Sequence, residues 1–452
     1  MQQDFMKTKP ILPLVLSMSL PMMLSMLVNS LYNIIDSMFV AKLGEDALTA
    51  VSLIYPLQTL VTSVGVGFGV GINAVAAFFL GAGEKDKADM ATTQGILLSI
   101  VHGLLLTLIT CLTLPGFLHL FTQDAQIYEW GLQYGHLVLS FAVISTLQIA
   151  IEKVFQAVGS MKVPMLCMTA GCVANIVLDP LFIFGIGFFP RMEIKGAAVA
   201  TVIGQVVTLV LYLVIWVRKD IGLHFSRKYV KPDSFILGRL YQIGIPSSLN
   251  MGLPSLLITI LNGIAALYAP IYILILGVYF KLQTFLYLPA NGIVQGMRPI
   301  VSYNYGAGEE KRMKKIIGLC SVLILAILCA GMLLFLLIPG LFMELFTGDA
   351  LTITEGSKAL RIISLGFVLS GISVVTSGTL EALGKGGLSF LISLLRNLAV
   401  IVPAALLGSY FFGVTGIWSA FPIAEVITAV VAGVILRSVL FHKQKTSKFT
   451  CE

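Results

Sequence analysis

Residues 163–184 read VPMLCMTAGCVANIVLDPLFIF, an apolar run that carries one acid near its end. A helix of this length rises about 33 Å and can cross a bilayer core of about 30 Å. Asn175 and Asp179 are four residues apart and share one helical face. An aspartate inside a spanning helix costs roughly 2.5–3.5 kcal/mol, and Pro180 frees one helix carbonyl. The stretch therefore predicts a membrane helix that holds a cation site.

The composition of the whole chain indicates a polytopic membrane protein. Of its 452 residues, 57% are hydrophobic and only 11% are charged, against roughly 25% charged in soluble domains. A soluble helical protein is excluded. Twelve segments have spanning length: 11–40, 47–80, 91–114, 131–157, 163–184, 195–217, 237–265, 271–303, 315–340, 357–382, 388–411 and 416–440.

Basic residues predict how these segments are oriented. Nineteen Lys and Arg residues lie at the ends and loops on one side of the segments, and four lie on the other side. Positive residues mark the cytoplasmic side, so we expect both termini in the cytoplasm. The net charge of +7 is then a topology signal and gives no reason to expect a nucleic-acid partner.

The chain also repeats itself. Gly81-Ala82-Gly83-Glu84 returns as Gly306-Ala307-Gly308-Glu309, and Phe121-Thr122 as Phe346-Thr347, both at an offset of 225 residues. Two halves of six helices each have the same orientation, so a pseudo-twofold axis along the membrane normal would relate them. We predict a first lobe at 1–218, a cytoplasmic linker at 219–236, a second lobe at 237–441 and a cytoplasmic tail at 442–452.

The acidic residues of the first half are not repeated in the second. Asp36 corresponds to Leu261, and Asn175 corresponds to Val400. A packing requirement of the fold would be expected in both halves. A function specific to the first lobe is therefore favoured for Asp36, Asn175 and Asp179.

Two further predicted helices of the first half have polar faces. Asn29, Asn33 and Asp36 follow one face of the first helix, with Tyr32 at its border. Thr201 and Gln205 are four residues apart in the sixth helix. We expect these faces to meet Asn175 and Asp179. Inter-helix hydrogen bonding, worth about 0.6 kcal/mol per contact, remains an alternative for the uncharged residues, but it cannot offset two buried aspartates.

Two charged residues of the second half are further substrate or coupling candidates. Lys281 could contact substrate, pair with an acid such as Glu381, or extend its ammonium to the interface. Glu425 stands where the first half has Gln205.

The chemistry of the predicted site is that of a proton or Na⁺. Paired carboxylates in apolar surroundings can take a proton near neutral pH, or bind Na⁺ with amide and hydroxyl oxygens. The residues do not choose between these ions. The sequence has no phosphate-binding loop, hydrolase triad or cofactor motif, so we expect a transporter driven by an ion gradient and not an enzyme.

These residues together resemble the multidrug and toxic compound extrusion (MATE) family. The resemblance rests on Asp36, on Asn175-x-x-x-Asp179-Pro180, on Leu80-Gly81-Ala82-Gly83 and on the two-by-six repeat. It is similar to the prokaryotic branch with DinF-like and MepA-like pumps. The resemblance implies a V-shaped fold of twelve helices, and a cation site at Asp36, Asn175, Asp179 and Thr201.

The resemblance further implies export of amphipathic, often cationic compounds in exchange for H⁺ or Na⁺. We expect a monomer in a bacterial plasma membrane. A lipid-linked saccharide flippase of the same superfamily is an alternative and would need a cationic cleft. A channel would need a continuous polar lining through both halves, which the polar asymmetry disfavours.

Overall fold

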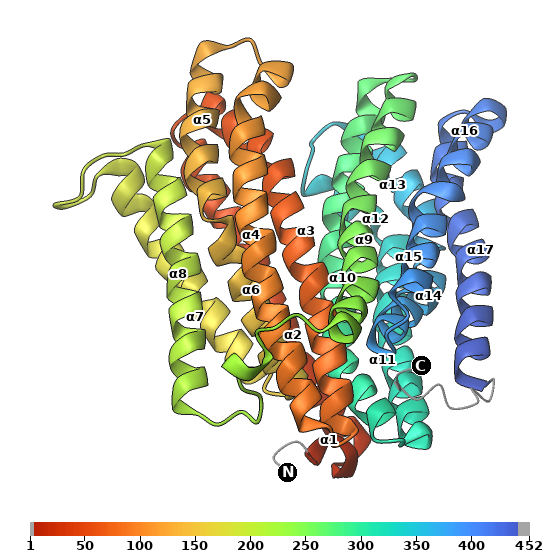
Figure 1. Cartoon of the computed structure of the whole chain (residues 1–452). Helices are drawn as coiled ribbons and strands as arrows, with labels where there is room; N and C mark the ends of the chain where they lie inside the picture. Colours follow the sequence, from red (N-terminus) through yellow and green to blue (C-terminus); the bar gives the residue numbers. More distant parts are fainter. Residues whose placement is uncertain (1–3, 442–452) are drawn as a thin grey trace.

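The computed structural model describes residues 4–441, which form helices and connecting turns without a strand in that range (Figure 1). The predicted tail at 442–452 lies outside the described residues. The helices are α1 (Phe5–Thr8), α2 (Ile11–Ala41), α3 (Glu45–Gly81), α4 (Lys85–Phe121), α5 (Ala125–Ser140), α6 (Ala142–Ala157), α7 (Lys162–Phe184), α8 (Ile194–Arg218), α9 (Ser234–Ala266), α10 (Pro270–Gly306), α11 (Glu310–Leu337), α12 (Pro339–Glu344), α13 (Ala350–Ser364), α14 (Phe367–Ala382), α15 (Gly386–Leu394), α16 (Ile401–Phe412) and α17 (Val414–Phe441). A 3₁₀ turn, η1 (Arg227–Tyr229), and a π-helical segment, η2 (Leu395–Ala399), complete the set.

Ten of the described helices or continuous helical stretches are long and apolar enough to cross a membrane, and two bent pairs bring the number to as many as twelve. The prediction of an all-helical polytopic membrane protein is confirmed. The segments predicted at 131–157 and 357–382 are not straight helices: α5 and α6 meet at 44°, and α13 and α14 meet at 50°. The breaks fall at Phe141 and at Leu365-Gly366, so the bend obeys the repeat offset of 225.

The repeated Phe-Thr-x-Asp-Ala motif has a local structural role. Asp124 Oδ1 accepts hydrogen bonds from the backbone of Gln126 and Ile127, at 2.8 and 2.9 Å, and caps α5. Asp349 Oδ2 accepts from Thr352 N at 2.8 Å and caps α13. These bonds satisfy backbone donors that a helix start leaves free. Hydrogen bonding from the Thr352 hydroxyl and backbone holds the pKa of Asp349 below its usual value.

The repeated Gly-Ala-Gly-Glu motif brings α3 and α10 together. A Cβ atom at Gly81 would overlap the backbone carbonyl of Tyr303, and one at Gly306 would overlap that of Phe78. The two contacts are reciprocal, because 78 and 303 are also 225 residues apart. Such reciprocity is the property of a twofold axis. The lobe boundaries at 1–218 and 237–441 stay a prediction, and we use "first lobe" for α2–α8 and "second lobe" for α9–α17.

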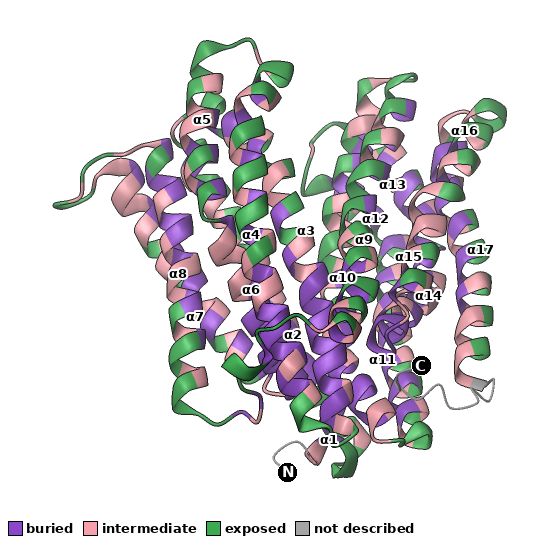
Figure 2. Cartoon of the chain, in the orientation of Figure 1, coloured by how far each residue is buried: buried purple, intermediate pink, exposed green. Residues whose placement is uncertain are grey.

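The lobes meet along only one half of their helices. The part of α3 from Ser63 to Leu80 is almost entirely buried, whereas the part from Glu45 to Thr62 is mostly exposed or half-buried. The same change occurs along α10 near Ala290. Figure 2 shows the buried residues concentrated where α2, α3 and α10 converge. Glycine makes this contact close, since a Cβ at Gly67 would overlap Ser248 on α9.

The connection between the lobes is held along α4. The backbone N–H of His224 donates to Asp89 Oδ1 at 2.8 Å, and the hydroxyl of Tyr229 donates to Asp86 Oδ1 at 2.7 Å. The linker was predicted at 219–236, but its last three residues belong to α9, which begins at Ser234 after the cap Asp233. A capping aspartate starts a helix earlier than the apolar pattern alone suggests.

Candidate ion and substrate site

Four predicted site residues converge inside the first lobe. Asp36 lies on α2, Asn175 and Asp179 on α7, and Thr201 on α8. Asp179 is fully buried, Asn175 is 2% exposed and Thr201 is 8% exposed. Asn175 Nδ2 donates to Thr201 Oγ1 at 3.4 Å, and the carboxyl groups of Asp36 and Asp179 lie within electrostatic range of each other. The structure therefore brings together three helices at one polar cluster.

Small residues make the α7–α8 part of this cluster possible. A Cβ at Gly204 would lie 2.9 Å from the carbonyl oxygen of Gly171 and 3.1 Å from Asn175 Cβ. With glycine at both positions the two helix backbones approach closely, as small residues allow in membranes. The Asn175 amide thereby reaches the Thr201 hydroxyl on the neighbouring helix.

The cluster contains buried oxygen atoms that no described residue satisfies. Asp36 Oδ1, Asn175 Oδ1 and both carboxylate oxygens of Asp179 accept no hydrogen bond within the described part of the chain. A buried acceptor without a donor is costly. All four atoms are acceptors, so a bound proton or an oxygen-liganded cation would satisfy them.

Two tyrosines border the cluster. Tyr32, a predicted candidate, lies beside Thr201 and Asp36. Tyr134 on α5 also lies beside Asp36 and Thr201, and Gln58 Nε2 on α3 donates to its hydroxyl at 3.5 Å. Sequence reasoning missed Tyr134 and Gln58. Gln58 was visible only as a member of the repeat, and a lone tyrosine in an apolar segment cannot be told from a packing residue.

The proline after Asp179 does not interrupt its helix. α7 continues through Pro180 to Phe184. Proline removes one i to i−4 hydrogen bond, which leaves the Ile176 carbonyl without its helical donor. The helix geometry around Asp179 is otherwise regular.

Other candidates lie outside the buried cluster. Asn33 is exposed and its amide donates to the backbone carbonyl of Asn29 at 2.8 Å, so this pair bonds within α2. Gln205 is half-buried, and its Oε1 is a further acceptor without a described partner. Lys281 is exposed, with its ammonium 5.9 Å from the centre of the Phe346 ring. It does not pair with Glu381.

The other buried acids of the spanning helices each have a basic partner. Glu152 pairs with Lys153 at 2.8 Å, Glu381 with Arg298 at 2.5 Å, and Glu425 with Arg396 at 2.7 Å. Within residues 4–441, no Lys, Arg or His nitrogen lies within 4.0 Å of the carboxylate of Asp36 or Asp179. The acid pair of the first lobe thus differs from its surroundings in lacking a resident cation.

A multi-helix membrane fold with an unpaired acid cluster at a helix junction defines a membrane transporter. The chain belongs to the MatE family, which matches residues 21–181 and again residues 246–406. The two matched stretches lie 225 residues apart, as the repeat does. Membership of this transporter family confirms the resemblance and places the chain outside the enzymes.

Full-length relatives and solved structures agree with this assignment. The multidrug export protein MepA of Staphylococcus saprophyticus is 28% identical over 422 residues, 92% of each chain. The crystal structure of a MATE protein in complex with MaL6 superposes with a TM-score of 0.90 at 24% identity, covering 97% of this chain and 98% of that one. The outward-facing conformation of a multidrug resistance MATE family transporter of the MOP superfamily gives 0.88 at 24% identity, covering 96% and 98%. These structures confirm the fold.

Proposed function

We propose that this chain exports amphipathic, often cationic compounds in exchange for H⁺ or Na⁺. The observation that carries the proposal is the unpaired state of Asp36 and Asp179 beside three buried acids that have basic partners. An acid that already has a lysine or arginine partner gives little room to an exchangeable cation. Two adjacent acids without a base require one, because uncompensated charge in a membrane interior is costly. The export of drug-like compounds is supported by relatives that are named multidrug export proteins.

The residues of the first lobe would bind the ion as follows. Asp36 and Asp179 supply the negative charge, and Asn175 Oδ1 and Thr201 Oγ1 supply neutral oxygens. Ion binding removes the repulsion between the two carboxylates and draws α2 toward α7. Loss of the ion restores that repulsion. The position of α2 relative to α7 is thus the quantity that ion binding changes.

The flippase alternative has less support. It would use positive charge to hold a diphosphate-linked lipid. Arg298 and Arg396 are neutralised by Glu381 and Glu425, and Lys281 lies over an aromatic ring. The distribution of charge therefore favours a cation-coupled exporter.

The orientation and oligomeric state belong to the same proposal. We place both termini, and the half of the helices along which the lobes meet, at the cytoplasmic side, because the basic residues gather there. One chain contains the complete polar cluster, so a monomer is sufficient.

The deciding experiment imposes one gradient at a time on proteoliposomes that contain the purified protein and a fluorescent organic cation. A pH gradient alone and a Na⁺ gradient alone are compared at zero membrane potential. Substrate movement against its own gradient under one of them identifies the coupling ion. If neither gradient drives movement, exchange is rejected.

A further inference from the structure

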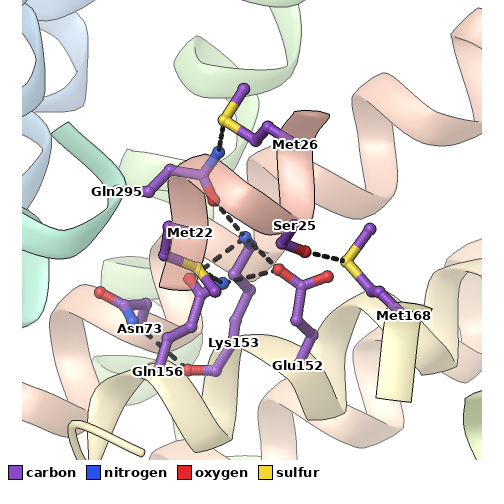
Figure 3. A network of polar contacts seen from close by, with 9 residues as sticks. All are labelled: Met22, Ser25, Met26, Asn73, Glu152, Lys153, Gln156, Met168 and Gln295. Carbon is purple, nitrogen blue, oxygen red and sulfur yellow. Dashed lines mark hydrogen bonds and ion pairs between the residues drawn. The ribbon is translucent and has the colours of Figure 1, made fainter. Parts of the chain in front are cut away.

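A second buried polar cluster lies where α6, α2 and α10 meet, and the proposed ion site does not include it (Figure 3). Lys153 on α6 is 5% exposed. Its ammonium lies 2.8 Å from Glu152 Oε1, 3.2 Å from Gln156 Oε1 and 3.5 Å from Gln295 Oε1. Glu152 and Gln156 belong to the first lobe, whereas Gln295 lies on α10 of the second. One buried ammonium therefore contacts both lobes.

The same cluster contacts the helix that carries Asp36. Gln156 Nε2 donates to Met22 Sδ at 3.2 Å, and Gln295 Nε2 donates to Met26 Sδ at 3.3 Å. Met22 and Met26 lie one turn apart on α2 (Figure 3). Asp36 lies ten residues further along this helix, about 15 Å along its axis. Thus α2 contacts the ion site with one part and the lobe junction with another.

The sequence repeat shows that this cluster is not a general requirement of the fold. At the offset of 225, Lys153 corresponds to Gly378, and Gln295 corresponds to Val70. Gly69 makes room for the lysine, since a Cβ there would lie 2.7 Å from Lys153 Cγ. The contact between Lys153 and Gln295 is as asymmetric between the halves as the aspartate pair is.

We propose that Lys153 and Gln295 are positioning residues of the exchange cycle, which link closure of the lobes to the position of α2; this rests on the proposed function. With the lobes together, Gln295 contacts both Lys153 and Met26. When α10 separates from α6, Lys153 keeps Glu152 and Gln156, so its charge stays compensated. A contact that opens without exposing an unpaired buried charge can form and break in each cycle.

Gln295→Val tests the proposal with the residue that the other half has at this position. Spin labels at K85C and K311C, in a background with the six native cysteines replaced, report the distance between the first turns of α4 and α11. One inter-helix hydrogen bond shifts a two-state equilibrium by roughly threefold. We expect Gln295→Val to raise the ratio of separated to closed lobes by about that factor, and to weaken its response to the coupling ion.

A second variant and a control guard against loss of folding. Glu152→Gln with Lys153→Met removes the ion pair as a unit and leaves no buried charge alone, and it should shift the ratio in the same direction. Glu381→Gln with Arg298→Met removes a buried pair of the second lobe that contacts α9 and α15 but not α2, and should leave the ratio unchanged.

Three results would overturn the proposal. The first is an unchanged distance distribution in Gln295→Val. The second is an equal shift in the control. The third is a shift that does not depend on the ion in a wild-type protein whose transport is driven by that ion. If neither gradient drives the wild type while Gln295→Val still shifts the ratio, the contact closes the lobes but has no part in exchange, and the proposed function fails separately.

Discussion

Arg396 Nε lies 2.7 Å from Glu425 Oε1, across the junction of the π-helical segment η2 and α17. Glu425 is therefore neutralised by a residue of its own lobe. Asp36 and Asp179 on the opposite side of the molecule have no such partner among the described residues. The two lobes share one architecture but differ in whether the protein supplies the cation.

This difference predicts the outcome of neutralising the first-lobe acids. Asp36→Asn and Asp179→Asn should each reduce gradient-driven efflux to the background of empty vesicles, because asparagine keeps the shape but cannot take the exchanged charge. Protein level should stay unchanged, since a neutral amide costs less to bury than a carboxylate. Efflux assays in cells and proteoliposomes measure this. Glu355→Gln, at an exposed ion pair with Lys358, is the control, and normal efflux in both aspartate variants would reject the site.

The Thr201 hydroxyl should contribute to ion affinity. Thr201→Val keeps the side-chain shape but removes the oxygen that accepts from Asn175. Loss of about 1 kcal/mol, the typical value of one hydrogen bond, would raise the half-saturating ion concentration about fivefold. Thr201→Ser should restore it. Thr208→Val removes a hydroxyl on the same helix that bonds to the Gly204 carbonyl and should not change it. Equal effects of the two valine variants would assign Thr201 a packing role.

Arg396 and Glu425 should behave as one unit. Arg396→Met leaves a buried carboxylate without its partner and should lower the free energy of unfolding by about 3–5 kcal/mol, measured by thermal unfolding in detergent. Adding Glu425→Gln should recover most of that loss and leave efflux intact. A stable double variant without efflux would instead assign Glu425 to coupling, the possibility that the sequence left open.

The glycine contact between the lobes should not tolerate a methyl group. Gly81→Ala places a Cβ against the Tyr303 carbonyl, and such overpacking typically costs 1–3 kcal/mol. The expected results are a lower thermal midpoint and fewer molecules with closed lobes. Gly318→Ala is the control, because no atom lies within 4 Å of a Cβ added on that face of α11. Equal midpoints for the two variants would contradict the contact.

The orientation can be tested with membrane-impermeant thiol reagents. Single cysteines at Glu84 and Glu309 follow α3 and α10, whereas those at Gln123 and Gly348 precede α5 and α13. All four positions are exposed. We expect labelling of the first pair only in inverted vesicles and of the second pair only in intact cells. The opposite pattern would reverse the proposed topology.

The sequence by itself determined the membrane fold and the repeat. Each of the twelve predicted segments coincides with a described helix or a bent pair. The reason is local: without water, a polypeptide in hydrocarbon must satisfy its backbone within one segment, so apolar length predicts the helix. Asp36, Asn175, Asp179 and Thr201 were also identifiable, because polar residues on lipid-facing helices are costly and must face one another.

Only the tertiary structure decided which charges have partners. Arg396 and Glu425 are 29 residues apart in the chain, and Arg298 and Glu381 are 83 apart; no spacing rule pairs them. The place of Tyr134 in the acid cluster and the contact of Lys153 with Gln295 likewise depend on how distant helices pack. The free energy of a buried charge depends on its neighbours in space, and helix packing alone selects those neighbours.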